Sequence, residues 1–206
     1  LEADDIYATC EALRAAGADA TITTDNVQAG ELACRHIVEK LGGGGQVVII
    51  NGPPVSATID RVAGCRKVLD AAPGIRLLSA DRNGGGTSEG GFAKMTDLLT
   101  LFPHIDAVFA INDPTAIGGD DAARQAGRSD FFIVGVDGAP KAKARMKDGN
   151  SLIAATVAQM ADKLAQKAVE AGYALIRNQA IPERTVLIPA VLLTRDSPPD
   201  TEDWSQ

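Results

Sequence analysis

The chain has 206 residues, of which 45% are hydrophobic and only 4% aromatic, so its core must consist mainly of Ala, Val, Ile and Leu. This length can form one large domain or two small ones. The net charge of −7 and the scattered basic residues argue against binding to nucleic acid or to an anionic membrane. The one basic cluster, at 141–147, is interpreted as the solvated face of a helix.

The first forty residues are predicted to hold two helices with a short extended run between them. Apolar residues at roughly helical spacing predict a helix over 4–16, and an extended run follows over 18–26. Apolar side chains four residues apart predict the second helix over 27–41, which GGGG at 42–45 ends. The opening residues do not resemble a signal peptide but are typical of a helix in the middle of a domain, so we expect the chain to begin inside a longer protein.

From residue 46 onward, strand-like and helix-like segments alternate. Short apolar runs bounded by turn residues predict strands at 46–50, 75–79, 107–111, 131–136 and 152–158. Helices are predicted at 57–71, 92–102, 114–126, 139–148 and 159–177. A last extended segment at 183–194 contains Pro189, which indicates an edge strand or a crossover.

This alternation predicts a doubly wound α/β fold with parallel strands and right-handed crossovers. In such sheets ligands bind outside the carboxyl ends of the strands, where Asn112, Asp137 and Gln159 stand. With Asp25 and Arg61 they form a set of planar polar side chains that can hold neighbouring hydroxyls of a sugar in bidentate fashion. Each alone could be an ordinary residue, since Asp25 could cap the helix after it and Asp137 could belong to a plain turn.

Two glycine runs are candidates for a phosphate-binding loop. The run at 42–45 precedes a strand, whereas a phosphate loop must follow a strand and open a helix. The loop at 81–91 does follow a strand, but it lacks the third glycine of GxGxxG, and the chain has no Gly-Lys-Ser/Thr. We therefore expect no nucleotide and no other cofactor.

The residues that usually carry catalysis are sparse. His36 is predicted within a helix and His104 in a turn, and the chain has neither a GxSxG nor an HExxH motif. Carboxylates at strand ends could serve acid–base chemistry, but without a nucleophile a hydrogen bond to a ligand is the favoured role. We therefore expect no catalytic residues.

The three cysteines, Cys10, Cys34 and Cys65, are widely spaced and form no CxxC motif. Neither a zinc site nor a redox motif is therefore indicated, and no metal is expected. Each cysteine is interpreted as a small hydrophobic residue packed in a helix.

Five motifs follow one another in an order typical of a known family: TTDN (23–26), IDRVAG (59–64), AINDPTAIG (110–118), VGVDGAP (134–140) and AATVAQ (154–159). In these motifs, and over about 18–195, the chain resembles the periplasmic sugar-binding proteins of the ribose/galactose type, the receptors of ATP-driven sugar importers. INDPTAIG together with VGVDG carries more of the likeness than either motif alone.

The resemblance implies a type I periplasmic-binding-protein fold, in which two α/β lobes joined by three crossing strands close on a sugar. It implies an incomplete first lobe, made of 1–44 and 159–180, whose initial strands would precede residue 1. The second lobe, with the crossovers, would comprise 45–158 and 181–195, and 196–206 would form a tail. Family members often stack an aromatic ring on the sugar from a segment near 81–86, where this chain has DRNGGG.

The resemblance also implies which side chains contact the sugar. The positions that match the family motifs are Asp25, Asn26, Arg61, Asn112, Asp137 and Gln159. The carboxylates and the arginine would form hydrogen bonds with sugar hydroxyls, and the amide side chains would complete this hydrogen-bond network.

The implied function is that of a solute-binding receptor of an ABC importer. Its partners would be a monosaccharide and a membrane permease, and it would be a periplasmic monomer that catalyses no reaction and binds no nucleic acid. Two alternatives remain open. The sugar-sensing core of a lac-repressor-type regulator shares the fold but would need a helix-turn-helix that this chain does not contain. A sugar-active enzyme would use the strand-end carboxylates and would show turnover.

Overall fold

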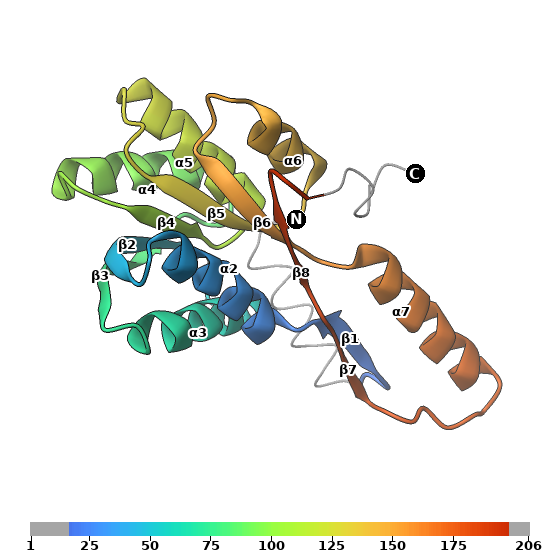
Figure 1. Ribbon diagram of the computed structural model, residues 1–206. Coiled ribbons are helices and arrows are strands. Elements are labelled where there is room, and N and C mark those ends of the chain that lie inside the picture. Colours follow the sequence, from blue (N-terminus) through green and yellow to red (C-terminus); the bar gives the residue numbers. More distant parts are fainter. Residues whose placement is uncertain (1–16, 198–206) are drawn as a thin grey trace. The chain divides into compact units, whose positions relative to one another are not determined.

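The structure is a computed structural model that describes residues 17–197. The chain divides into two compact units (Figure 1). The small unit comprises Leu1–Asp25 and Met160–Pro189, and the large unit comprises Asn26–Gln159 and Ala190–Gln206. The chain therefore crosses from one unit to the other after residues 25, 159 and 189. The helix expected at 4–16 lies outside the described residues.

The small unit contains one short sheet and one helix among its described residues. Strand β1 (Thr21–Thr24) pairs in parallel with β7 (Thr185–Ile188), and helix α7 (Ala161–Ile176) packs beside β1. No residue of α7 is buried, and Val169 and Ile176 are strongly exposed. A two-stranded sheet and a single helix leave apolar surface uncovered, which a closed domain core would bury.

The large unit is built on a six-stranded sheet with the strand order β3-β2-β4-β5-β6-β8. Its strands are β2 (Gly44–Asn51), β3 (Gly74–Asn83), β4 (Ala107–Ala110), β5 (Phe132–Asp137), β6 (Ile153–Ala158) and β8 (Val191–Thr194). The first five strands in this order are mutually parallel, and β8 is antiparallel to β6. The expected doubly wound parallel α/β architecture is confirmed.

Helices cover both faces of this sheet (Figure 1). The helices of the large unit are α2 (Asn26–Lys40), α3 (Ser56–Asp70), α4 (Ser88–Leu101), α5 (Asp113–Gln125) and α6 (Pro140–Lys147). One apolar core lies between the sheet and the α2–α3 pair, and a second lies between the sheet and α4, α5 and α6. Central strands are buried on both faces, which explains why they read as continuous apolar runs.

The expected helices and strands of residues 17–197 are present, with one informative difference. Strand β3 runs to Asn83, and helix α4 begins at Ser88, so the predicted loop at 81–91 is much shorter than expected. The Thr87 side chain caps α4 by accepting a hydrogen bond from the backbone N–H of Gly90 at 3.0 Å. Pro189 separates β7 from β8, and these strands belong to different sheets, which agrees with the crossover, one of the two roles expected for Pro189.

The division between the units differs from the expected pairing of 1–44 with 159–180 and of 45–158 with 181–195. Helix α2 belongs to the large unit, because it packs against α3, and the boundary therefore lies after residue 25. Strand β7 belongs to the small unit, because it pairs with β1. Local sequence patterns did not contain this information, since the α2–α3 contact joins two helices that strand β2 separates in the chain.

Helices α2 and α3 approach each other closely at two glycines. A methyl group on Gly30 would clash with the backbone of Arg61 and Cys65, and one on Gly64 would clash with the carbonyl of Val27. Cys34 and Cys65, both fully buried, form a disulfide between the two helices, with their Cα atoms 5.1 Å apart. The interpretation of these two cysteines as unpaired packing residues was therefore wrong, although both do lie buried in helices; Cys10 lies outside the described residues.

Gly64→Ala should lower the free energy of unfolding of the large unit by about 1–3 kcal/mol, the usual cost of forcing extra atoms into a packed contact. The added methyl group meets backbone of α2, which cannot move aside as a flexible side chain would. Gly119→Ala is the matched control, because it is also helical and its nearest neighbour, Ile133 Cδ1, would lie at an ordinary 3.6 Å. Urea denaturation of both variants measures the difference, and equal stabilities would contradict the close approach.

Within residues 17–197, no helix has the length and apolar character that a membrane crossing requires.

Candidate functional site

Polar side chains gather at the carboxyl edge of the large sheet, where its strand order reverses. The chain proceeds from β2 outward to β3 and then returns to β4 on the other side of β2. Such a reversal leaves a crevice outside the carboxyl ends of the two central strands, which is the usual ligand position in open α/β sheets. Arg61, from the helix that follows β2, reaches across this point to the carbonyl of Ile111, which follows β4, at 2.9 Å.

Arg61 is the centre of the network. It is buried, with only 6% of its surface exposed. Its Nε donates to Asn26 Oδ1 at 2.9 Å, and its Nη1 lies 3.2 Å from Asp137 Oδ1. The guanidinium plane is thereby fixed by groups from α2, from β5 and from the residue that follows β4, so its orientation is set before any ligand arrives.

Asp137 occupies the last position of β5 in an unusual backbone conformation. Its φ of +133° is in the region that favours glycine, so a side chain is held here at a cost in strain. Its Oδ1 also accepts a hydrogen bond from Gln159 Nε2 at 2.8 Å. Burial raises the pKa of Asp137, whereas the positive charge of Arg61 and the bond from Gln159 oppose that rise. The carboxylate is thus presented at the strand end, partly desolvated and next to a fixed cation.

Asp113 is a buried carboxyl group that was not among the residues expected at this site. Its Oδ2 accepts from the backbone N–H of Ala139 at 2.7 Å, and its Oδ1 lies 2.6 Å from the hydroxyl of Thr156. These bonds tie together the segments that follow β4 and β5 and strand β6. Burial, together with the nearby charge of Asp137, raises the pKa of Asp113 to about 7. Its position next to Asn112 in the ND pair was the one available signal.

The raised pKa of Asp113 predicts a pH effect on stability. The folded protein binds this proton more tightly than the unfolded chain does, so the contribution of Asp113 is greatest below about pH 4 and is lost as the pH rises towards about 7. The wild type should lose at most about 4 kcal/mol of its free energy of unfolding over this pH range. Asp113→Asn mimics the protonated acid and should not show this loss. Urea denaturation at several pH values tests it: the stability of the variant relative to the wild type should rise between pH 4 and 7. A constant difference would contradict the assignment.

Asn112 lies at the same edge but is engaged in local structure. It caps helix α5, since its Oδ1 accepts from the backbone N–H of Thr115 at 3.0 Å. Its Nδ2 donates to the carbonyl of Gly86 at 2.9 Å, which fastens the loop after β3. Asn112 therefore has the role of a helix cap, which was the ordinary structural alternative to ligand binding for these polar residues.

Of the six expected residues, four form one connected hydrogen-bond and ion-pair network, and they are Asn26, Arg61, Asp137 and Gln159. Asn112 stands beside this network, next to Ile111 and Asp113. Asp25 belongs to the small unit, where its backbone N–H donates to the carbonyl of Ile188 at 2.8 Å.

Neither histidine belongs to this network. His36 lies within α2, and His104 contacts Asp106 at 3.0 Å before the amino end of β4, away from the carboxyl edge. Within residues 17–197, no group of three or more His, Cys, Asp or Glu side chains is placed to hold a metal ion.

A doubly wound unit with a fixed arginine–carboxylate–amide network at its strand ends defines a class of small-molecule-binding α/β proteins. The chain belongs to the periplasmic binding protein domain family, whose model matches residues 5–180.

Curated relatives of the chain include ribose import binding proteins. The chain is 34% identical over 161 residues to the ribose import binding protein RbsB of Escherichia coli K12, covering 78% of this chain and 53% of that protein. It is 34% identical over 176 residues to RbsB of Bacillus subtilis, covering 84% of this chain and 55% of that protein. The chain thus spans about half the length of these relatives.

A solved structure with a bound sugar has a similar fold. An ABC transporter periplasmic solute-binding protein from Actinobacillus succinogenes, crystallised with D-allose, superposes with a TM-score of 0.81 at 29% identity. The match covers 90% of this chain and 64% of that protein. A galactofuranose-binding protein superposes with a TM-score of 0.80 at 27% identity, covering 86% of this chain and 62% of that protein.

Proposed function

We propose that this chain is the greater part of a solute-binding receptor of an ABC importer, and that its ligand is a monosaccharide. The observation that carries the proposal is the pre-set network of Arg61, Asp137 and Gln159 at the carboxyl edge of the large sheet. Family membership and the sugar-importing relatives support the same class of ligand.

The chemistry of this network suits adjacent sugar hydroxyls. A hydroxyl both donates and accepts, so it can donate to the Asp137 carboxylate while it accepts from Arg61 or from an amide N–H. Bonds to charged partners are the stronger ones, and a fixed guanidinium loses little freedom when it binds. We assign Asp25, Asn26, Arg61, Asn112, Asp137 and Gln159 as ligand contacts, with Asn112 also serving as a helix cap.

The remaining parts of the proposal concern the whole protein. The large unit would be one complete lobe, and the small unit would be part of the other. Ligand-bound receptor would be recognised by a membrane permease, and the receptor itself would catalyse no reaction. A periplasmic location fits the Cys34–Cys65 disulfide, because such bonds persist in oxidising compartments.

Titration calorimetry against ribose, xylose, fructose, galactose, glucose and allose tests this function. We expect saturable heat with at least one of these sugars, measured on the chain extended by whatever residues its gene encodes upstream. The same titration of the 206-residue chain shows whether these residues bind without that extension.

The variant Asp137→Gly tests whether the heat measured in the titration comes from binding at this site. Glycine accepts the φ of +133° without strain, so the fold should survive while the carboxylate is lost. Heat that persists unchanged in Asp137→Gly would contradict the site, and the absence of heat with every sugar on the extended chain would contradict the function.

A further inference from the structure

The backbone at the end of β5 forms a turn that depends on contacts from other elements. Asp137 has a φ of +133° and Gly138 a φ of +74°, and both values lie in the region that favours glycine. Gly138 adopts its value freely, whereas Asp137 carries a Cβ and is strained. Strained backbone of this kind persists only where the surrounding structure fixes it. The contacts that fix this turn therefore also set the direction of the Asp137 side chain.

Two side chains hold the N–H groups that follow Asp137. The hydroxyl of Thr156, on β6, accepts a hydrogen bond from the N–H of Gly138 at 3.1 Å. Oδ2 of Asp113, the first residue of α5, accepts one from the N–H of Ala139 at 2.7 Å. The Thr156 hydroxyl also donates to Asp113 Oδ1 at 2.6 Å, which joins the two side chains to each other. Both are fully buried, so water does not compete for these bonds.

Asp113 contacts Asp137 through its main chain as well. Its backbone N–H donates a hydrogen bond to the Asp137 carboxylate. The same residue thus binds the carboxylate through its main chain and the turn behind it through its side chain. Arg61 and Gln159 reach the carboxylate from other directions, at 3.2 and 2.8 Å. A change in the turn would therefore move the carboxylate relative to both of these groups.

Two glycines give the Asp113–Thr156 pair the space that it needs. A methyl group on Gly135, in β5, would lie 2.5 Å from Asp113 Oδ1. A methyl group on Gly138 would lie 2.5 Å from the Cβ of Ala158, in β6. Both distances are too short for a side chain, so β5 and the turn after it fit closely against Asp113 and β6. The pair is thus a packed feature of the interior and not a surface contact.

We propose that Asp113 and Thr156 are positioning residues for sugar binding, because they hold Asp137 in the conformation that presents its carboxylate to the ligand. Neither side chain has exposed surface through which it could contact a sugar. The inference rests on the proposed function, since it takes Asp137 as a sugar contact. It extends that function to two residues that act only through Asp137.

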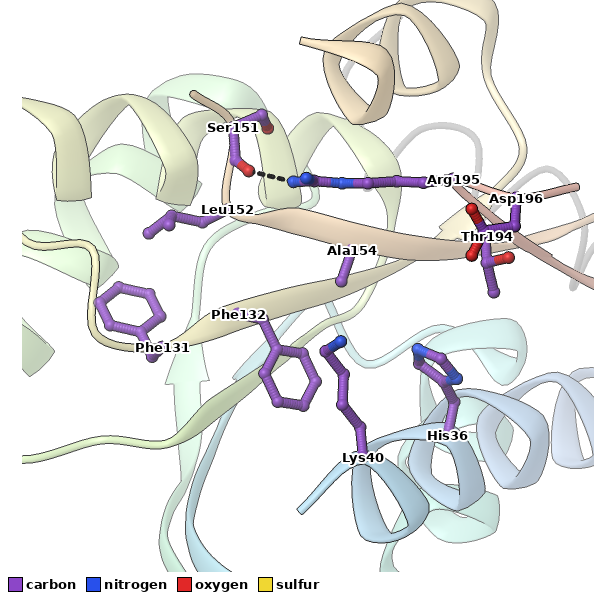
Figure 2. Close-up of a pocket in the computed structure, with 10 residues that line it drawn as sticks. All are labelled: His36, Lys40, Phe131, Phe132, Ser151, Leu152, Ala154, Thr194, Arg195 and Asp196. Carbon is purple, nitrogen blue, oxygen red and sulfur yellow. Dashed lines mark hydrogen bonds between the residues drawn. The ribbon is translucent and has the colours of Figure 1, made fainter. Parts of the chain in front are cut away.

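Thr156→Val keeps the approximate size of the side chain and removes its hydroxyl. We expect its sugar affinity, in titration calorimetry of the upstream-extended chain, to fall about tenfold or more, because the N–H of Gly138 loses its acceptor and the turn can relax. Thr156→Ser retains the hydroxyl and should recover most of this affinity. The matched control is Thr194→Val, at the end of β8, where Thr194 lines a pocket near the amino ends of β5 and β6 (Figure 2). This control should leave the affinity unchanged.

The Asp137→Gly background separates positioning from a general loss of structure. Without the carboxylate there is nothing for the hydroxyl to position, so adding Thr156→Val should weaken binding less than about twofold. Equal weakening with and without the Asp137 carboxylate would show that Thr156 acts on the fold alone, which would overturn the proposal.

NMR supplies a measurement that needs no ligand and decides the matter if Asp137→Gly binds too weakly to titrate. The coupling between the amide and α protons of Asp137 reports its φ. It should change in Thr156→Val and return to the wild-type value in Thr156→Ser. A wild-type coupling typical of an extended strand would overturn the proposal even if Thr156→Val did not fold.

The outcomes for the inference and for the proposed function are distinct. A folded Thr156→Val protein with wild-type coupling or wild-type sugar affinity would overturn the inference alone. Absence of heat with every sugar in the wild type would contradict the proposed function and, with it, the role of the pair in sugar binding.

Discussion

Arg61→Lys should reduce monosaccharide affinity by roughly 30-fold to several thousandfold, the range that corresponds to about 2–5 kcal/mol for loss of a buried hydrogen-bonded charge contact. The positive charge remains, but lysine lacks the planar fork that contacts Asn26, Ile111 and Asp137 together. At least one of these partners is left without its donor, and the ligand loses a fixed orientation of charge. Titration calorimetry with the sugar that the wild type binds measures the loss.

The matched control is Arg66→Lys, at an exposed arginine five residues further along α3. It should leave the affinity unchanged. Circular dichroism must show that Arg61→Lys remains folded at the temperature of the titration, because a buried unsatisfied partner costs about 1–3 kcal/mol of stability. A folded Arg61→Lys protein with wild-type affinity would remove Arg61 from the binding site.

Reduction of the Cys34–Cys65 disulfide should lower the free energy of unfolding of the large unit by about 4 kcal/mol, the chain-entropy value for a loop of this length. The bond joins residues separated by 31 positions, and both cysteines are fully buried between α2 and α3. These two helices also carry Asn26 and Arg61, so we expect sugar affinity to fall in the reduced protein even where it stays folded. Urea denaturation with and without reductant measures the stability change.

The reference protein for this experiment is the Cys10→Ser variant. It lacks the third cysteine, so no thiol–disulfide exchange with that residue can occur. In that background, Cys34→Ala/Cys65→Ala should reproduce the effect of reduction, and the reductant should then have no further effect. An unchanged urea midpoint in the double variant would contradict the stabilising role of the bond. Since the cysteines are buried, reduction is expected to require partial unfolding or strong reductant.

The alternation of helices and strands was predictable because the central strands are buried on both faces. Runs such as 107–111 and 131–136 are apolar throughout, so they are easily recognised as strands. Each is followed by a helix whose first residues are typical of a helix start. The stretch at 81–91 was harder, because its glycines indicate a loop. In the structure, Gly91 and Gly118 instead let α4 and α5 approach, since a methyl group on either would strike the other helix.

Features that depend on contacts between distant segments were not predictable from local patterns. The disulfide needs α2 and α3 to lie side by side, and nothing in the spacing of Cys34 and Cys65 states that they do. The assignment of α2 to the large unit depends on the same contact. Both corrections therefore have one physical origin, the close helix pair built around Gly30 and Gly64.

The candidate site was partly predictable for a simple geometric reason. Parallel strands bring their carboxyl ends to one edge, so polar residues at strand ends, such as Asp137 and Gln159, were expected to meet. Arg61 came from the resemblance and the polar character of its side chain, because a helix position does not by itself indicate the direction of a long side chain. Asp113 was missed because a buried carboxyl group next to Asn112 reads as part of a helix start.

The three chain crossings have a consequence for how this protein can evolve. Asn26 and Gln159 stand directly beside two of the crossings, and Ala190, which follows the third, donates its N–H to Gln28 of α2 at 2.9 Å. The disulfide and the close helix pairs favour movement of the large unit as one block, so torsions at the crossings would absorb any hinge motion. The proposed ligand contacts Asn26 and Gln159 are therefore neighbours of the residues whose torsions a hinge motion would use, so under this proposal a substitution that alters one property would also alter the other.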